Sequence, residues 1–98
     1  MLGVARLGDR TRGICKAHSS PKDVEGTIIT ASIDTMCDHF GVARNGDIIL
    51  SDCGHTATIV TSSIMTIDNN LGVARIGDIG IGDYECTIVT ASTTTLSG

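Results

Sequence analysis

The chain has 98 residues, with seven Lys or Arg against eleven Asp or Glu and a formal net charge of −4. This length suits one domain and is too short for two independent cores. The acidic balance, with one Phe, one Tyr and no Trp, argues against a protein that binds nucleic acid through phosphate neutralisation or base stacking.

Residue usage favours strands over helices. Ile and Thr each occur thirteen times and Gly twelve times, whereas the good helix formers are sparse. We therefore predict an all-β domain whose core lacks large aromatic side chains and needs further support to become rigid. No apolar stretch predicts a signal peptide or a transmembrane helix, so we expect synthesis in a reducing cytosol, where cysteines bind metal more readily than they form disulfides.

The first predicted element is a turn, Gly-Val-Ala-Arg-Leu-Gly-Asp, at residues 3–9. The same motif recurs at 41–47 and 72–78, with six of its seven positions identical in all three copies. Its second Gly allows a positive φ and a tight bend, and its Arg and Asp can pair across that bend. Taken alone, each pair reads as a weak surface ion pair; threefold recurrence indicates that the pairs set the geometry of a repeat.

A variable loop and two short strands follow each turn. The Thr/Ile-rich strands are predicted at 27–32, 58–63 and 87–92, and the second short strands at 33–36, 64–67 and 93–96. From the motif Asp to the next strand, the loops span 18, 11 and nine positions. Because loops absorb such changes and paired strands do not, the loops should gather at one end of the molecule. We predict one domain, residues 1–98, made of three β-hairpin units at about 3–40, 41–71 and 72–98, related by a pseudo-three-fold axis.

The repeated Ala-Arg-x-Gly-Asp, the Cys/His-bearing loops and the strands that end at Ala-Ser or Ser-Ser resemble PAAR-repeat proteins along essentially the whole chain. The motif here begins Gly-Val-Ala-Arg in place of Pro-Ala-Ala-Arg. The resemblance implies a cone with a metal near its apex. It also implies a seat on the C-terminal end of a trimeric β-helical spike, one chain per trimer, in a contractile phage tail or a type VI secretion system.

The Cys and His residues fall at comparable places in the loops. Cys15 and Cys53 each lie six positions beyond their motif Asp, His18 and His55 follow them closely, and Cys86 directly precedes the third strand. Such convergence is what a tetrahedral metal site requires. We predict a closed structural site formed by His18, Cys53, His55 and Cys86, with Cys15 as the substitute. Zn is the expected ion, and Fe is compatible with the same residue types.

Cys37 and His39 lie at the other end of the predicted strands, and we expect a structural or interfacial role for them. No HExxH motif or nucleophilic triad is present, so we expect no enzyme activity.

The predicted function is a rigid spike tip that helps to breach the target envelope in transient contact with it, located on the virion at the tail baseplate. The alternatives are a secretion-spike tip, a free-standing zinc-binding adaptor, and a small metalloenzyme or redox protein.

Overall fold

We describe a computed structural model of the chain, which covers residues 2–32, 35–37, 40–63, 67–68, 71–93 and 95–97. The structure is all-β, with no helix among these residues, as predicted. None of them forms a helix long and apolar enough to cross a membrane.

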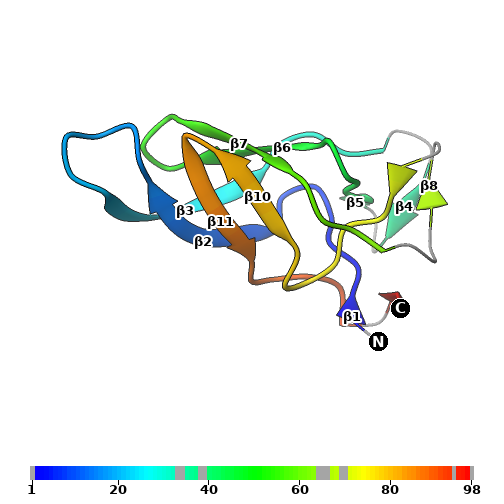
Figure 1. Ribbon diagram of the computed structural model, residues 1–98. Helices are drawn as coiled ribbons and strands as arrows, with labels where there is room; N and C mark the ends of the chain where they lie inside the picture. The colour runs from blue at the N-terminus through cyan, green and yellow to red at the C-terminus, as the bar shows by residue number, and fades with distance from the viewer. Residues whose placement is uncertain are drawn as a thin grey trace.

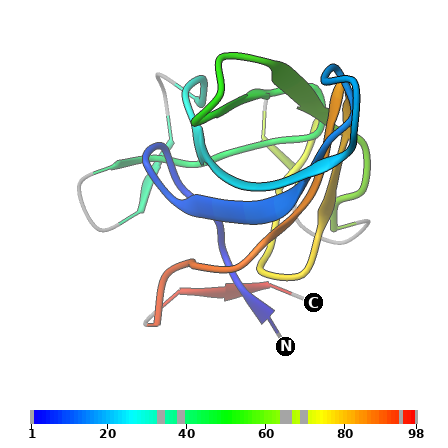
Figure 2. The same cartoon turned by 90° about the vertical axis from the view of Figure 1, so that its left-hand side faces the viewer.

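Six longer strands form a closed antiparallel barrel (Figures 1 and 2). They are β2 (Arg10–Cys15), β3 (Lys22–Ile28), β6 (Ile48–Ser51), β7 (Thr56–Ile59), β10 (Ile79–Gly82) and β11 (Tyr84–Ile88). Around the barrel their order is β10, β11, β2, β3, β6 and β7, and β7 pairs again with β10. The closed ring leaves these strands without the free edges that promote aggregation.

Three pairs of barrel strands form hairpins: β2 with β3, β6 with β7, and β10 with β11. The first strand of each hairpin begins directly after a motif Asp, within the region predicted as a variable loop. The three hairpin tips point to one end of the molecule, which we call the loop end (Figure 1). Each second strand stops at the first Ile of a predicted Thr/Ile segment, so residues such as Ile29 and Val60 lie beyond the ladder.

Six shorter strands form three separate two-stranded sheets, which we call the base ribbons. They are β1 (Leu2–Gly3) with β12 (Leu96–Ser97), β4 (Met36–Cys37) with β5 (Phe40–Gly41), and β8 (Ile67–Asp68) with β9 (Leu71–Gly72). They lie at the end opposite the hairpin tips, which we call the base end (Figure 1). The molecule is elongated, measuring 39 × 23 × 22 Å. Parts of the predicted short strands, residues 33–34, 64–66 and 94, lie outside the described residues.

The repeated sequence provides the core. The three motif Ala residues are fully buried in the main cluster, together with the Ile that ends each second hairpin strand; these residues are Ala5, Ala43, Ala74, Ile28, Ile59 and Ile88. The three motif Val residues, Val4, Val42 and Val73, form a second cluster. Small and β-branched side chains therefore fill a narrow interior, in which Tyr84 is the one buried aromatic ring among the described residues.

Backbone hydrogen bonds join the three motifs in a cycle. The Ala5 amide donates to the Ala74 carbonyl, Ala74 to Ala43, and Ala43 to Ala5, at 2.9, 2.9 and 3.0 Å. Isolated bridges connect the same segments, pairing Val4 with Arg75, Arg6 with Val42, and Arg44 with Val73. Each motif thus contacts both of the others, and the third closes back on the first.

Each motif Asp is buried and accepts hydrogen bonds from two directions. Asp78, for example, accepts from the backbone N and the guanidinium of Arg75, at 2.7 to 3.1 Å, and from the hydroxyl of Thr61 at 2.8 Å. The corresponding donors are Arg6 and Thr90 to Asp9, and Arg44 and Thr30 to Asp47. The Thr of the first unit binds the Asp of the second unit, and the Thr of the second binds the Asp of the third. The Thr of the third unit binds the Asp of the first, so this network also runs around the whole domain.

Candidate metal centre

Four Cys and His side chains meet at the loop end. Cys15 ends β2, His18 lies in the loop between β2 and β3, and Cys53 and His55 lie in the turn between β6 and β7. One ligand atom from each of the four lies within 4.8 Å of the others. The site thus joins segments that are about forty positions apart in sequence.

Direct contacts define the centre of this group. Nδ1 of His55 lies 3.3 Å from Sγ of Cys15 and 3.5 Å from Sγ of Cys53. The rings of His18 and His55 meet edge to face, with centroids 5.3 Å apart. Nε2 of His18 is buried and has no hydrogen-bond partner in the structure. A buried ring nitrogen without a partner is costly, and a metal ion would supply the missing interaction.

The turn that carries Cys53 and His55 is fixed by its own backbone. Gly54 adopts a φ of 93°, a conformation that side-chain-bearing residues rarely adopt. Oγ of Ser51 accepts a hydrogen bond from the His55 amide at 3.0 Å and lies 3.0 Å from Sγ of Cys53. The Asp52 amide donates to the Glu25 carbonyl at 2.8 Å, which ties the turn to β3. Both ligands are therefore presented by a rigid segment.

The two thiols have opposite electrostatic environments. Hydrogen bonds from Ser51, and then from His18 and His55, lower the pKa of Cys53 to about 5. Burial raises the pKa of Cys15. Cys53 is therefore a thiolate at neutral pH, while Cys15 would release its proton when a metal binds.

This donor set could hold a metal ion. Two thiolates and two imidazoles provide four ligands, the number and type found in closed tetrahedral structural sites. All four positions would be filled by the protein, so the set provides no open position for a water or a substrate. The chemistry that it supports is cross-linking of two hairpins.

Of the four predicted ligands, the structure places His18, Cys53 and His55 together, and the fourth member of the group is Cys15, the predicted substitute, not Cys86. Cys86 faces the barrel interior and lies opposite Gly13 in the β2–β11 ladder, whereas Cys15 lies two residues further on, opposite Tyr84. Cys86 therefore lies further from the loop end than Cys15 does, and it is absent from the group of four. His39 and the side chain of Cys37 lie outside the described residues.

Two supporting residues were not singled out from the sequence. Ser51 contacts both the Cys53 thiol and the His55 amide, and its place two positions before Cys53 is the only sequence signal for that role. Tyr84 fills the barrel beneath the centre, and its hydroxyl lies 2.9 Å from Oγ1 of Thr11. As the only Tyr of the chain, inside a predicted loop, it could have been recognised as a core residue.

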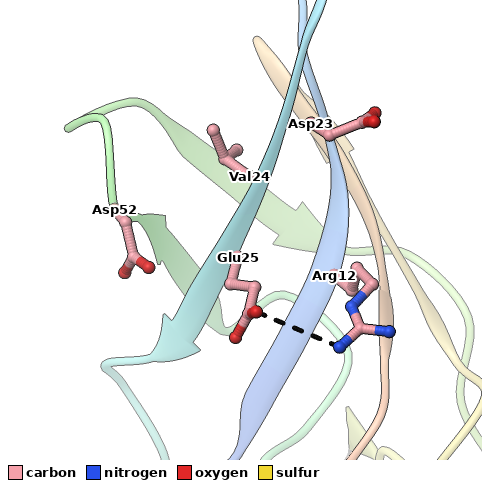
Figure 3. Close-up of a pocket in the computed structure, with 5 residues that line it drawn as sticks. All are labelled: Arg12, Asp23, Val24, Glu25 and Asp52. Carbon is pink, nitrogen blue, oxygen red and sulfur yellow. Dashed lines mark ion pairs between the residues drawn. The ribbon is translucent and has the colours of Figure 1, made fainter.

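An open groove of about 440 Å³ runs along the outer wall beside the centre and is lined by Arg12, Asp23, Val24, Glu25 and Asp52 (Figure 3). Its carboxylates are largely engaged by arginines. The Arg10 guanidinium lies 3.0 Å from Asp52 and 3.3 Å from Glu25, and these contacts raise the pKa of Arg10. Arg12 lies 3.9 Å from Glu25. The groove is an ion-paired surface beside the turn, and exposed pairs of this kind add little to stability.

Comparison with known protein families and with curated proteins finds no match to this chain. Its function is therefore argued from the site and from the arrangement of the repeats.

Proposed function

We propose that the protein is the metal-stabilised tip of a trimeric β-helical spike in a contractile injection machine, as its resemblance to PAAR-repeat proteins implies, and that it helps to pierce the target envelope. The observation that carries this proposal is the cyclic pairing of the three motifs. A single chain whose repeats contact one another in a ring can present three equivalent surfaces to a trimer.

Further contacts support a pseudo-three-fold arrangement of β-hairpin units. The amides of Leu7, Asn45 and Ile76 donate in turn to the carbonyls of Gly41, Gly72 and Gly3. The Arg–Asp–Thr network is likewise repeated in each unit with nearly equal distances. In the proposed cone, the base ribbons form the wide end and the hairpin tips form the narrow one.

The base end has features of a docking surface. The residue before each motif Gly is apolar and exposed: Leu2 by 43%, Phe40 by 51% and Leu71 by 40%. The guanidinium of Arg6 also lies 5.9 Å from the centre of the Phe40 ring. Exposed apolar residues at three equivalent positions, each the first residue of a short strand in a separate sheet, suit the end of a trimeric β-helix, which presents three strand edges.

The loop end has features of a tip. Four ligands from two hairpins close one site there, and we propose Zn as its ion because two thiolates and two imidazoles match its preference, with Fe as the other candidate. A closed site supports a structural rather than an enzymatic role. Its contribution would replace the large aromatic core that the chain lacks.

The proposal is tested by mixing the protein with the C-terminal β-helical fragment of the spike from the same source and measuring the mass of the complex. We expect one chain per three spike chains. Phe40→Asp should weaken binding at least tenfold, whereas the matched control Ile81→Asp, at an exposed apolar position on the barrel wall, should not. A protein that binds metal but no spike would be a free-standing adaptor, and that result would overturn the proposal.

The proposal covers a phage tail tip and, as its alternative, a secretion-spike tip. The spike that captures the protein in this assay would distinguish the two.

A further inference from the structure

We propose that Cys15 and Cys53 form a disulfide when no metal is bound, so that the loop end can be closed covalently once the protein has left a reducing compartment. This inference concerns the regulation of the proposed metal centre and rests on that part of the proposed function. It assigns a redox role to the same pair of sulfurs.

Geometry places the two sulfurs within reach of each other. Their Sγ atoms belong to a group whose members lie within 4.8 Å, and both contact the same ring nitrogen of His55. A disulfide requires the sulfurs to approach to about 2.05 Å, and from within 4.8 Å of each other they can do so by rotation of the two side chains. The backbones on both sides stay in place, because Cys15 is held in the ladder opposite Tyr84 and Cys53 in the rigid turn.

Exposure sets the order of the reaction. The Cys53 side chain is half-buried, whereas Cys15 is 0% exposed and Cys86 is 5% exposed. An oxidant from solution therefore reaches Cys53 first, and Cys15 acts as the resolving thiol from the protein interior. Cys86 lies outside the group and has no such partner within it.

The oxidant we name is a small-molecule disulfide of the glutathione class. Sγ of Cys53 attacks one of its sulfurs as the thiolate, the small S–S bond breaks, and the first small thiol leaves as a thiolate that takes a proton from solvent. Sγ of Cys15 then attacks Sγ of Cys53, and the second small thiol leaves with the Cys15 proton. Two protein thiols are oxidised and one small disulfide is reduced to two thiols. A metal bound to both sulfurs would slow the first step, because coordination lowers the nucleophilicity of the Cys53 thiolate.

The sequence makes the product easy to locate. Trypsin cleaves after Arg12, Lys16, Arg44 and Arg75, which puts the four cysteines on four different peptides. Treating the metal-free protein with oxidised glutathione should lower its mass by about 2 Da and link peptide 13–16 to peptide 45–75. The linked protein should melt at a higher temperature than the reduced metal-free protein.

Two variants test the order. Cys15→Ser should retain glutathione on Cys53 as a stable mixed disulfide, because the resolving thiol is missing. Cys53→Ser should leave Cys15 unmodified under the same conditions. A link to the Cys86 peptide or to a second chain would overturn the inference. So would free Cys15 and Cys53 thiols after exhaustive treatment.

A zinc-loaded sample separates this inference from the metal proposal. We expect it to oxidise at least about tenfold more slowly than the metal-free protein. If the protein binds no zinc and oxidises equally fast in both samples, the metal centre fails and the disulfide stands. If it binds zinc and the metal-free protein never forms the 13–16 to 45–75 link, the redox inference fails and the metal centre stands.

Discussion

At the scale of single residues, Tyr84 reports on the barrel core. It is the only tyrosine of the chain, it is fully buried, and burial raises its pKa to about 12. An unfolded chain ionises its tyrosine near pH ~10. Because the folded pKa is higher than the unfolded one, the stability contributed by Tyr84 is complete below pH ~10 and is lost as the pH rises through 12.

We therefore predict that the native protein shows almost no tyrosinate absorbance at pH ~10.5, and that its free energy of unfolding falls by roughly 2–3 kcal/mol between pH ~10 and ~12. The Tyr84→Phe variant should lose this alkaline sensitivity. At neutral pH it should be less stable by only about 1 kcal/mol, since it lacks the hydrogen bond to Thr11. A native protein that titrates near pH ~10 would contradict the buried position of the ring.

The next test concerns which cysteine, Cys15 or Cys86, is the fourth metal ligand. Both are buried thiols facing the barrel interior, so truncating either leaves a cavity of similar size. We predict that Cys15→Ala purifies with less than about a tenth of the zinc bound by the native protein, whereas Cys86→Ala retains it. Elemental analysis of the two variants decides between the ligand sets. The opposite result would favour the set containing Cys86.

Much of the centre could be predicted from residue spacing. His18, Cys53 and His55 lie in loops whose place relative to the motif Asp is plain in the sequence, and loops of equivalent units meet at one end. The choice between Cys15 and Cys86 depends on strand register. This register is the alignment of β2 with β11, two strands that are distant in sequence. A shift of one strand along the other would move a cysteine toward the metal site or away from it.

At the scale of elements, the motif turn is held by a buried carboxylate. Asp78 is 5% exposed and accepts from Arg75 and Thr61. We predict that Asp78→Asn lowers the free energy of unfolding by roughly 2–4 kcal/mol, because it removes the negative charge that the Arg75 guanidinium binds and disturbs the hydrogen bond from Thr61 of the preceding unit. Urea unfolding measures this loss. The control Asp23→Asn, with the same charge change at an exposed site, should stay within about 0.5 kcal/mol.

Two glycines are required for different physical reasons. Gly77 has a φ of 89° and open space where a Cβ would project, so we predict that Gly77→Ala costs about 1–2 kcal/mol through backbone strain alone. At Gly13 a Cβ would overlap the Glu85 carbonyl and lie 2.5 Å from the Cα of Cys86. Since β2 and β11 would have to separate, Gly13→Ala should cost more than about 3 kcal/mol. Equal losses in urea unfolding would contradict this distinction.

At the scale of the whole molecule, the sequence shows the all-β class and the positions of the turns because both are local properties. β-Branched residues favour strands wherever they lie, and Gly46 needs its positive φ whatever surrounds it. Barrel closure is different. The pairing of β10 with β7 and of β11 with β2 joins distant segments, and the strand Arg10–Cys15 carries charged residues and a Gly that obscure its pattern. Such pairings are fixed by tertiary packing, which a single sequence does not display.

We propose that the metal stabilises the loop end and that the motif turns are stabilised by their own hydrogen bonds. Removal of the metal should therefore affect the molecule only locally. The motif turns lie where β2, β6 and β10 begin, at the barrel end opposite the ligands, and they are joined by their own cyclic hydrogen bonds. Because those bonds involve no ligand, a chelator should increase amide hydrogen exchange mainly in the loop around His18 and in the turn 52–55. It should also lower the melting temperature while leaving the β-content unchanged.

The Asp78→Asn variant should give the reverse pattern. Its amides near the motif turns should exchange faster, while its zinc content stays that of the native protein, because the four ligands lie in other segments. Uniform loss of protection after chelation would contradict this picture, since it would mean that the ion holds the entire barrel together. Localised loss would instead show that the repeats close the ring and that the ion only fixes the hairpin tips.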